Sequence, residues 1–369
     1  MVKHRVIPSR ARRRGIPCRG GSLAALGMTL IVAAAAHAET FRVFGSLGAE
    51  SQLSPANTDS PLNPHNVAAL PYTTNVADAA LYADAKSERV KAHVKLRADA
   101  SDRAADHLQV GEAFLQANLR PWLDVTAGRL IEKWGTGYAW NPVAFVSPQK
   151  NPTDPTDRRG AYRGVDMLRA DAFVRDTNIS VYALRDHAVA ARVYRLVGGT
   201  DVSLHVRHDA SGTQQGVSLA RVFGEALELH SEVTRRHLLL GGQYTFPKNV
   251  NVIAEVYRSG DGLTESQWRA FQNSIEPSSL LDANRRYAPL RMARNYAFVR
   301  ADAPFGKNDV ELIAIANLRD GSSIARLTLS RKLRPNLSAY VIETEFLGGG
   351  EMSYIQLKRL TTFGARVYF

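Results

Sequence analysis

Hydrophobic and polar residues alternate along most of this chain, in segments of about ten residues. Val202, Leu204 and Val206, for example, alternate with Ser203, His205 and Arg207. The same alternation recurs in residues 168–174, 227–233, 250–256 and 310–316. Because successive side chains of a strand point to opposite faces of a sheet, this period predicts β-strands with one apolar and one polar face.

We expect about 18 strands, with 16 as the other possible count. They are predicted to begin near residues 41, 77, 89, 108, 122, 165, 178, 189, 200, 213, 225, 237, 250, 294, 309, 323, 337 and 358. The longest links, about 51–76, 133–164 and 260–293, follow odd-numbered strands. Short links rich in Gly, Pro, Asn and Asp follow even-numbered ones. A soluble β-sandwich shows similar alternation, but this distribution of loops favours an antiparallel up-and-down barrel that crosses a membrane.

Residues 1–38 are predicted to form a cleaved signal peptide. Seven cations and no acid precede an apolar run over residues 23–36, and Ala36-His37-Ala38 supplies small residues before Glu39. A membrane anchor is the alternative, but the run is shorter than the roughly 20 residues of a spanning helix. Since no later stretch is apolar for long enough either, membrane residence of residues 39–369 requires a closed barrel.

Cleavage of the signal peptide changes the charge and the cysteine content. Loss of seven cations lowers the formal net charge from +12 to +5, so the basic character of the whole chain does not indicate nucleic acid binding. Cys18 is the single cysteine and leaves with the signal. The mature chain is therefore expected to have no disulfide and no thiolate metal site, and we predict neither a metal nor a cofactor.

The chain ends in an alternating segment with a terminal aromatic residue. Phe363, Ala365, Val367 and Phe369 share one face of the predicted last strand. This ending resembles the terminal signature of Gram-negative outer-membrane barrel proteins. The resemblance implies an outer-membrane location, contact with lipid and lipopolysaccharide, and recognition of Phe369 by the barrel-assembly machinery.

Charged residues occupy the polar faces of the predicted strands. A barrel of 16–18 strands usually encloses water, so these side chains are expected to line a polar lumen. They are Arg169, Asp171, Arg175, His205, Arg207, Glu228, His230, Glu232, Arg300, Asp302, Glu311 and Arg326. His230 between Glu228 and Glu232 raises the question of a metal site, but one strand alone rarely completes one, and we interpret the three as lumenal charges.

The link after the fifth strand is the least strand-like part of the chain and holds two of the four tryptophans. A Gly-Arg strand, Gly128-Arg129, leads into a Trp-Gly loop, Trp134-Gly135, and this pattern resembles substrate-specific porins whose loop folds inward. We therefore expect a constriction or substrate platform, since aromatic faces stack on ligands and charged groups select ions. The candidate residues are Arg129, Lys133, Trp134, Tyr138, Trp140, Lys150, Asp154, Asp157, Arg158, Arg159, Arg169, Asp171 and Arg300. Alternatively, the aromatic residues belong to the girdle at the lipid interface.

The link over residues 258–293 carries mixed charges and is predicted to include a short helix within residues 268–281. We interpret it as a solvated extracellular surface, with a lid or a receptor for an external ligand as the alternative.

Together these features predict an outer-membrane channel for passive or substrate-selective diffusion of a small hydrophilic solute. The mature charge of +5 hints at a preference for anions. A plugged barrel that serves an envelope export or assembly complex is the alternative. An enzyme is not expected, because the sequence contains no nucleophile-elbow, phosphate-loop or dinucleotide motif.

Overall fold

A computed structural model describes residues 38–104 and 106–369. The predicted signal peptide lies outside the described residues except for Ala38, so its cleavage stays a prediction. Among the described residues, no helix is long and apolar enough to cross a membrane.

The described chain forms a single sheet of 18 strands. The strands are β1 (Thr40–Leu53), β2 (Thr73–Lys86), β3 (Val90–Ser101), β4 (His107–Arg120), β5 (Leu123–Leu130), β6 (Val165–Val174), β7 (Thr177–Leu184), β8 (Val189–Val197), β9 (Thr200–Asp209), β10 (Gly212–Phe223), β11 (Leu227–Thr234), β12 (His237–Phe246), β13 (Val250–Ser259), β14 (Asn295–Phe305), β15 (Asn308–Asn317), β16 (Ser323–Arg334), β17 (Leu337–Leu347) and β18 (Arg359–Tyr368). The predicted count of 18 is confirmed. The largest difference is at β2, which begins four residues before the predicted position 77.

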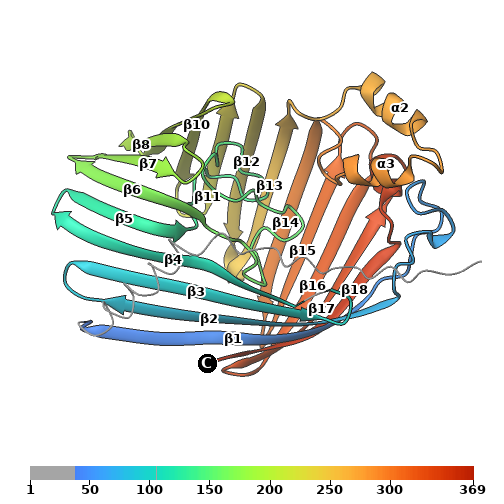
Figure 1. Ribbon diagram of the computed structural model, residues 1–369, viewed down its shortest axis with the longest axis horizontal. Coiled ribbons are helices and arrows are strands. Elements are labelled where there is room, and N and C mark those ends of the chain that lie inside the picture. Colours follow the sequence, from blue (N-terminus) through green and yellow to red (C-terminus); the bar gives the residue numbers. More distant parts are fainter. Residues whose placement is uncertain (1–37, 105) are drawn as a thin grey trace, which may run out of the picture.

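The sheet closes into an antiparallel barrel, because β1 pairs with both β2 and β18 (Figure 1). The last residue takes part in the closure: the Phe369 amide donates to the Gly45 carbonyl at 3.1 Å, and the Gly45 amide donates to Phe369 at 2.9 Å. Every other neighbouring pair of strands is consecutive in sequence. The predicted up-and-down barrel is therefore confirmed.

Alternation along the strands separates two surfaces of the barrel wall. Leu168, Leu204 and Leu229 point outward and are about half exposed, at 51%, 53% and 48%. Their neighbours His205 and Glu232 point inward and are buried. A closed sheet leaves no unpaired edge in lipid, so this wall meets the requirement for a membrane-spanning barrel.

The three longest connections gather at one end of the barrel (Figure 1), where two-residue links also join β9 to β10 and β11 to β12. The links at the other end all have two or three residues. Residues 54–72, 131–164 and 260–294 follow β1, β5 and β13, whereas two-residue turns such as Gly198-Gly199 and Pro335-Asn336 follow even-numbered strands. This distribution agrees with the predicted one.

Short helices occur only in the connections of the described chain. They are η1 (Pro64–Asn66), η2 (Pro247–Asn249), α2 (Glu265–Asn273), α3 (Leu280–Arg286) and η3 (Gly350–Tyr354). The single helix expected within residues 268–281 is thus replaced by α2 and α3. Pro277 explains the break, since proline lacks an amide hydrogen and disfavours helical geometry in the preceding residue.

The link over residues 260–294 is only partly the solvated surface that we expected. Trp268 and Phe271 of α2 are buried and pack against Leu62 and Tyr354, which come from two other connections at the same end of the barrel. Charged residues such as Glu265 and Arg269 pair on the exposed side of α2.

Candidate functional site

Residues 131–164, which we call the inward loop, fold into the barrel rather than away from it (Figure 1). The loop leaves the wall between β5 and β6 and bonds to inward-facing groups of β11, β13, β1 and β16. In the circular strand order, β11 and β16 are reached from β5 in opposite directions. The inward loop therefore contacts the lumenal wall on several sides.

Glu232 of β11 holds the first part of the inward loop through backbone amides. Its carboxylate accepts from the amides of Thr136 and Gly137, both at 2.6 Å, and from Val143 at 3.1 Å. Gly135 is required by this approach, because its φ is +86° and a Cβ there would lie 2.3 Å from a Glu232 oxygen. The glycine of the Trp-Gly pattern thus lets the backbone dock on the wall.

Glu255 of β13 repeats this arrangement one step further along the loop. It accepts from the amides of Tyr138 and Ala139, the latter at 2.8 Å, and lies 2.9 Å from His230 Nε2. Two buried carboxylates that each accept backbone amides make strong, charge-assisted contacts. His230 therefore supports the loop anchor, and the described residues contain no group of three or more potential metal ligands.

The two tryptophans of the inward loop pack inside the barrel. Trp134 is 2% exposed and its indole donates to the Tyr182 hydroxyl at 3.2 Å. Trp140 stacks on Tyr257 at 5.0 Å between ring centroids and also contacts Tyr296. Neither side chain belongs to the outward-facing girdle, and both fasten the loop to the wall.

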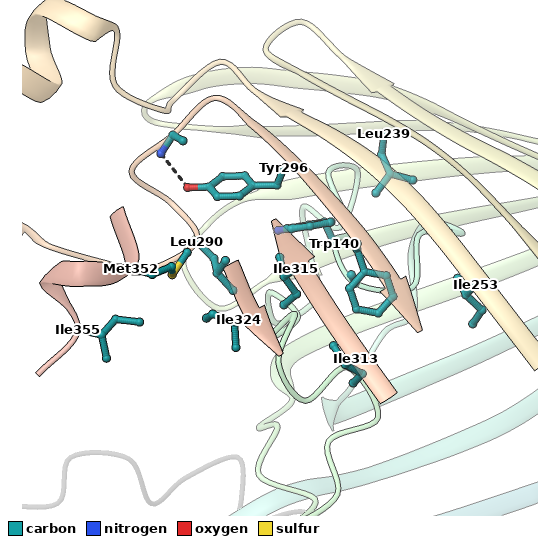
Figure 2. Close-up of a cluster of buried hydrophobic side chains, with 13 residues drawn as sticks. Trp140, Leu239, Ile253, Leu290, Tyr296, Ile313, Ile315, Ile324, Met352 and Ile355 are labelled. Atoms are coloured by element: carbon teal, nitrogen blue, oxygen red, sulfur yellow. Dashed lines mark hydrogen bonds between the residues drawn. The ribbon is translucent and has the colours of Figure 1, made fainter. Parts of the chain in front are cut away.

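Trp140 belongs to an apolar cluster that occupies the β12–β16 side of the lumen (Figure 2). Ile313 and Ile315 of β15 supply part of it, and Leu290 and Met352 reach it from the connections after β13 and β17. A second cluster surrounds Trp134 on the β5–β8 side. Apolar packing thus fills two sides of the lumen.

The tip of the inward loop binds the wall formed by β1, β16 and β17. Glu50 of β1 accepts from Arg158 at 2.5 Å, from Arg159 and, at 2.7 Å, from the Tyr340 hydroxyl. Burial alone would lower the pKa of Arg158, but its hydrogen bond and ion pair with Glu50 outweigh burial and raise that pKa. Arg158 is therefore held charged at the tip, and Arg159 pairs with the same carboxylate.

Asp154 and Asp157 have different roles at this tip. Arg326 of β16 lies 3.6 Å from Asp154 and also donates to the Thr153 carbonyl. Asp157 accepts from the amides of Ala161 and Tyr162, at 2.6 and 2.9 Å. Asp154 thus connects the loop to the wall, whereas Asp157 shapes the loop itself.

Lys133, Lys150 and Tyr138 occupy different environments within the loop. The Lys133 side chain is exposed, while Lys150 donates to the Gly137 carbonyl at 2.5 Å, and burial lowers the pKa of Lys150. Tyr138 lies beneath the guanidinium of Arg300, 5.3 Å from the ring centroid, and burial raises the pKa of Tyr138 to about 12. Of these three, Lys133 is the side chain most open to solvent.

Arg169 and Arg300 face the lumen within ion-pair clusters. Arg169 lies 2.7 Å from both Glu132 and Asp171, and Arg300 lies 2.7 Å from Glu311 and also pairs with Asp302. Each cation is therefore compensated by two acids, so neither cluster carries a net positive charge.

Arg129 differs from our expectation of a lumenal residue. It is the cross-strand partner of Asp166, and the next pair on the same face of the sheet is Ala127 with the outward-facing Leu168. Arg129 bonds to Asp166 at 2.7 and 2.8 Å on this outward side. The register of β5 with β6 thus removes Arg129 from the candidate constriction.

The residues that anchor the inward loop include several that the sequence did not single out. Glu50, Glu255 and Tyr340 are each on the polar face of a strand, which was the available signal. Their partners were not predictable from that signal, since Glu50 and Arg158 are 108 residues apart in the chain.

Comparison with known proteins identifies the fold. No protein family and no curated protein matches the sequence. Among solved structures, a mutant of Rh. blastica porin has 13% identity and a TM-score of 0.50, with 89% of this chain and 100% of that chain covered. OccK5 (OpdH) of Pseudomonas aeruginosa has 9% identity and a TM-score of 0.55, with coverage of 90% and 98%. The protein has the β-barrel fold of an outer-membrane porin.

Proposed function

We propose that this protein is an outer-membrane channel through which a small hydrophilic solute diffuses, with the inward loop as its constriction. The observation that carries the proposal is the docking of the loop tip on Glu50, which places Arg158 and Arg159 inside a closed barrel. A loop that narrows a polar lumen and presents fixed charges there can select solutes by size and charge.

The side chains around the lumen indicate where a solute would pass. Apolar clusters occupy the β5–β8 and β12–β16 sides, so charged lumenal wall remains at β9–β11 and at β1–β3 with β18. We propose that the solute follows the second of these, β1–β3 with β18. Asp78, Lys95, Arg97 and Arg366 lie there, beside the tip of the inward loop. A path along this wall suits a hydrophilic solute, because the groups beside it are charged.

Single-channel recording tests this proposal. The full precursor would be produced in a Gram-negative host, and the protein purified from its outer membrane would be inserted into a planar lipid bilayer. We expect discrete conductance steps, and a reversal potential in a salt gradient that indicates a modest preference for chloride over potassium. A folded, heat-modifiable protein without current would overturn the channel.

A plugged barrel that serves an export or assembly complex is the second candidate. The observation in its favour is that the inward loop binds β1, β11, β13 and β16 while apolar clusters fill two sides of the lumen. The same recording distinguishes the two functions, since a plugged barrel carries no steady current. Recovery of a defined envelope complex by cross-linking in cells would then support the second function.

A further inference from the structure

Six consecutive strands each direct one aromatic side chain into the lumen. β17, β18 and β1–β4 lie side by side in the closed sheet (Figure 1). The register of these strands places one ring from each on the same face of the wall as the lumenal residues Glu50 and Lys95. We call this set the aromatic arc, and its members are Tyr340, Tyr368, Phe44, Tyr82, His93 and Phe114.

Four rings of the aromatic arc are in contact from strand to strand. Phe44 stacks on Tyr82 with 4.9 Å between the ring centroids and an angle of 2° between the ring planes. His93 follows at 6.3 Å from Tyr82 and 5.2 Å from Phe114. These separations lie within the roughly 4.5–7 Å that aromatic pairs favour, so the rings of β1–β4 form a continuous row.

The tip of the inward loop lies directly beside the aromatic arc. The Arg158 guanidinium is 4.7 Å from the centroid of the Tyr340 ring. A Cβ added to Gly160 would lie 3.4 Å from the Tyr82 hydroxyl. From these contacts the arc extends toward the short-turn end, where β1 begins and β18 ends. A solute that passes the tip along this wall therefore meets the arc next.

Two members of the aromatic arc are open to solvent. Phe44 is 42% exposed and Tyr368 is 49% exposed. Within the described chain, Phe44 has no cross-strand partner in β18, because the pairing of β1 with β18 begins at Ser46. Phenylalanine is most often buried, so its exposure on a polar wall calls for a partner. These two rings therefore offer free apolar surface to a solute, and Tyr82 supports Phe44 from behind.

Acids and cations flank the row of rings in equal number. Arg42 and Asp84 are cross-strand partners on this face, and so are Lys95 and Glu112. Asp84 also lies 2.6 Å from His93 Nδ1. Two cations and two acids leave no net charge beside the row, counting full charges at neutral pH. Carboxylates accept and cations donate hydrogen bonds, so this wall can pair with hydroxyl groups, which do both.

We infer that the aromatic arc is a binding site for a neutral sugar, with a pyranose ring stacked on Phe44. A pyranose has a face of C–H groups, which packs on an aromatic ring, and a rim of hydroxyl groups, which suits the flanking charges. A cavity of about 370 Å³ beside Tyr340 and Tyr368 provides space for the ligand. The inference rests on the proposed channel for its role in transport, but binding itself can be measured without any current.

Titration of the folded protein in detergent, followed by saturation-transfer NMR, tests the site with maltose as the probe. We expect maltose to bind the wild-type protein more tightly than sorbitol does, since sorbitol carries its hydroxyl groups on a flexible chain without a ring face. Phe44→Leu is expected to bind maltose about tenfold more weakly, because leucine keeps an apolar side chain but loses the flat surface.

The matched control is Phe41→Leu. Phe41 belongs to the same strand and is 56% exposed, but it pairs with Ala85 on the outward face. This variant is expected to bind maltose like the wild type. Equal loss in both variants, or equal binding of maltose and sorbitol, would overturn the site. Tighter binding of benzoate than of maltose would also overturn it, since the arc would then favour an aromatic solute over a sugar.

Channel recordings keep the two proposals apart. If maltose binds as expected but no current flows, the site stands and the channel fails. If current flows but Phe44→Leu binds maltose like the wild type, the channel stands and the site fails. Heat-modifiable migration of each variant on a gel establishes that it is folded.

Discussion

Single residues decide how the inward loop is held. Glu50, Glu232 and Glu255 are buried carboxylates on the lumenal wall, and each accepts hydrogen bonds from the loop. Removing one partner from a buried pair leaves the other charge uncompensated, at a cost of about 3–5 kcal/mol. These acids are therefore the residues whose replacement is expected to free the loop.

Glu50→Gln tests the anchor of the loop tip. Glutamine keeps the size of the side chain but loses the charge that binds Arg158 and Arg159. We expect larger and noisier single-channel currents, because the undocked tip becomes more populated. Glu228→Gln is the control, since Glu228 is lumenal and lies beside His230 rather than the loop. Unchanged conductance in Glu50→Gln would contradict the assigned role.

Gly135→Ala tests the docking of the loop backbone on Glu232. The substitution strains a residue with φ of +86° and also brings a Cβ against the carboxylate. Gly199→Ala is the matched control, because Gly199 has φ of +80° but nothing within 4 Å of the added Cβ. Both variants are expected to lose about 1 kcal/mol through backbone strain. Only Gly135→Ala should make the inward loop cleavable by added protease. Equal resistance to protease in the two variants would contradict the close approach of the loop backbone to Glu232.

At the scale of elements, connections pack against strands and against one another. The inward loop is fastened by Trp134 and Trp140, and the three outer connections meet in the cluster of Leu62, Trp268 and Tyr354. Such contacts join residues that are far apart in the chain. They hold these connections in place against the barrel, although the composition of the connections resembles that of ordinary turns.

Trp140→Ala tests the packing of the inward loop on β13–β15. Truncation of a buried tryptophan is expected to lower the free energy of unfolding by about 3–5 kcal/mol. Urea-induced unfolding of the refolded barrel, followed by circular dichroism, measures this loss. Trp122→Ala provides the comparison, since Trp122 is 53% exposed at a turn. A loss in Trp140→Ala no larger than in Trp122→Ala would argue against the packing role.

Glu351 of η3 makes the outer connections sensitive to pH. It is fully buried and accepts from Tyr296, from Asn317 and from two backbone amides of the link after β13. Burial raises the pKa of Glu351 above its ordinary value despite these donors. A raised pKa in the folded state means that the contribution to stability is complete below the unfolded pKa and is lost as pH rises through the folded pKa.

We therefore expect residues 260–294 to resist protease better at about pH 4, below the ordinary glutamate pKa, than at alkaline pH. Glu351→Gln should remove this difference, because the side chain no longer titrates. Glu276→Gln, an exposed acid of the same link, should retain it. The same pH dependence in Glu351→Gln as in the wild type would assign the effect to other groups.

At the scale of the whole molecule, the barrel has two distinct ends. All long connections lie at one end, the other end has only links of two or three residues, and the last strand closes on the first through Gly45 and Phe369. In outer-membrane barrels the short turns face the periplasm and the long loops face the exterior. Recognition of Phe369 by the assembly machinery stays a prediction.

Cysteine labelling in cells tests this orientation. Cys18 is the single cysteine and is predicted to leave with the signal peptide, so an introduced cysteine would be unique. Ser278→Cys, exposed in the link after β13, is expected to react with a maleimide too large for the pore in intact cells. Asn336→Cys, exposed in a short turn, should react only after the outer membrane is permeabilised. The reverse labelling pattern would show that the long connections face the periplasm and would overturn this orientation.

The sequence by itself determined the barrel. Alternation and turn composition are local properties, so they indicated 18 strands, their approximate starts and the end at which the long connections lie. The charged lumenal faces of β6, β11 and β14 followed from the same alternation. The sequence wrongly predicted Arg129 to face the lumen. The pairing of β5 with β6, and not the Gly-Arg pattern, decides which face Arg129 occupies.

The tertiary structure alone decided what the loops do. Two consequences of closure are that Glu50 binds Arg158 and that Glu255 accepts hydrogen bonds from backbone amides more than a hundred positions away. Closing the sheet brings distant strands and loops into contact, and no local pattern of residues specifies which of them will meet.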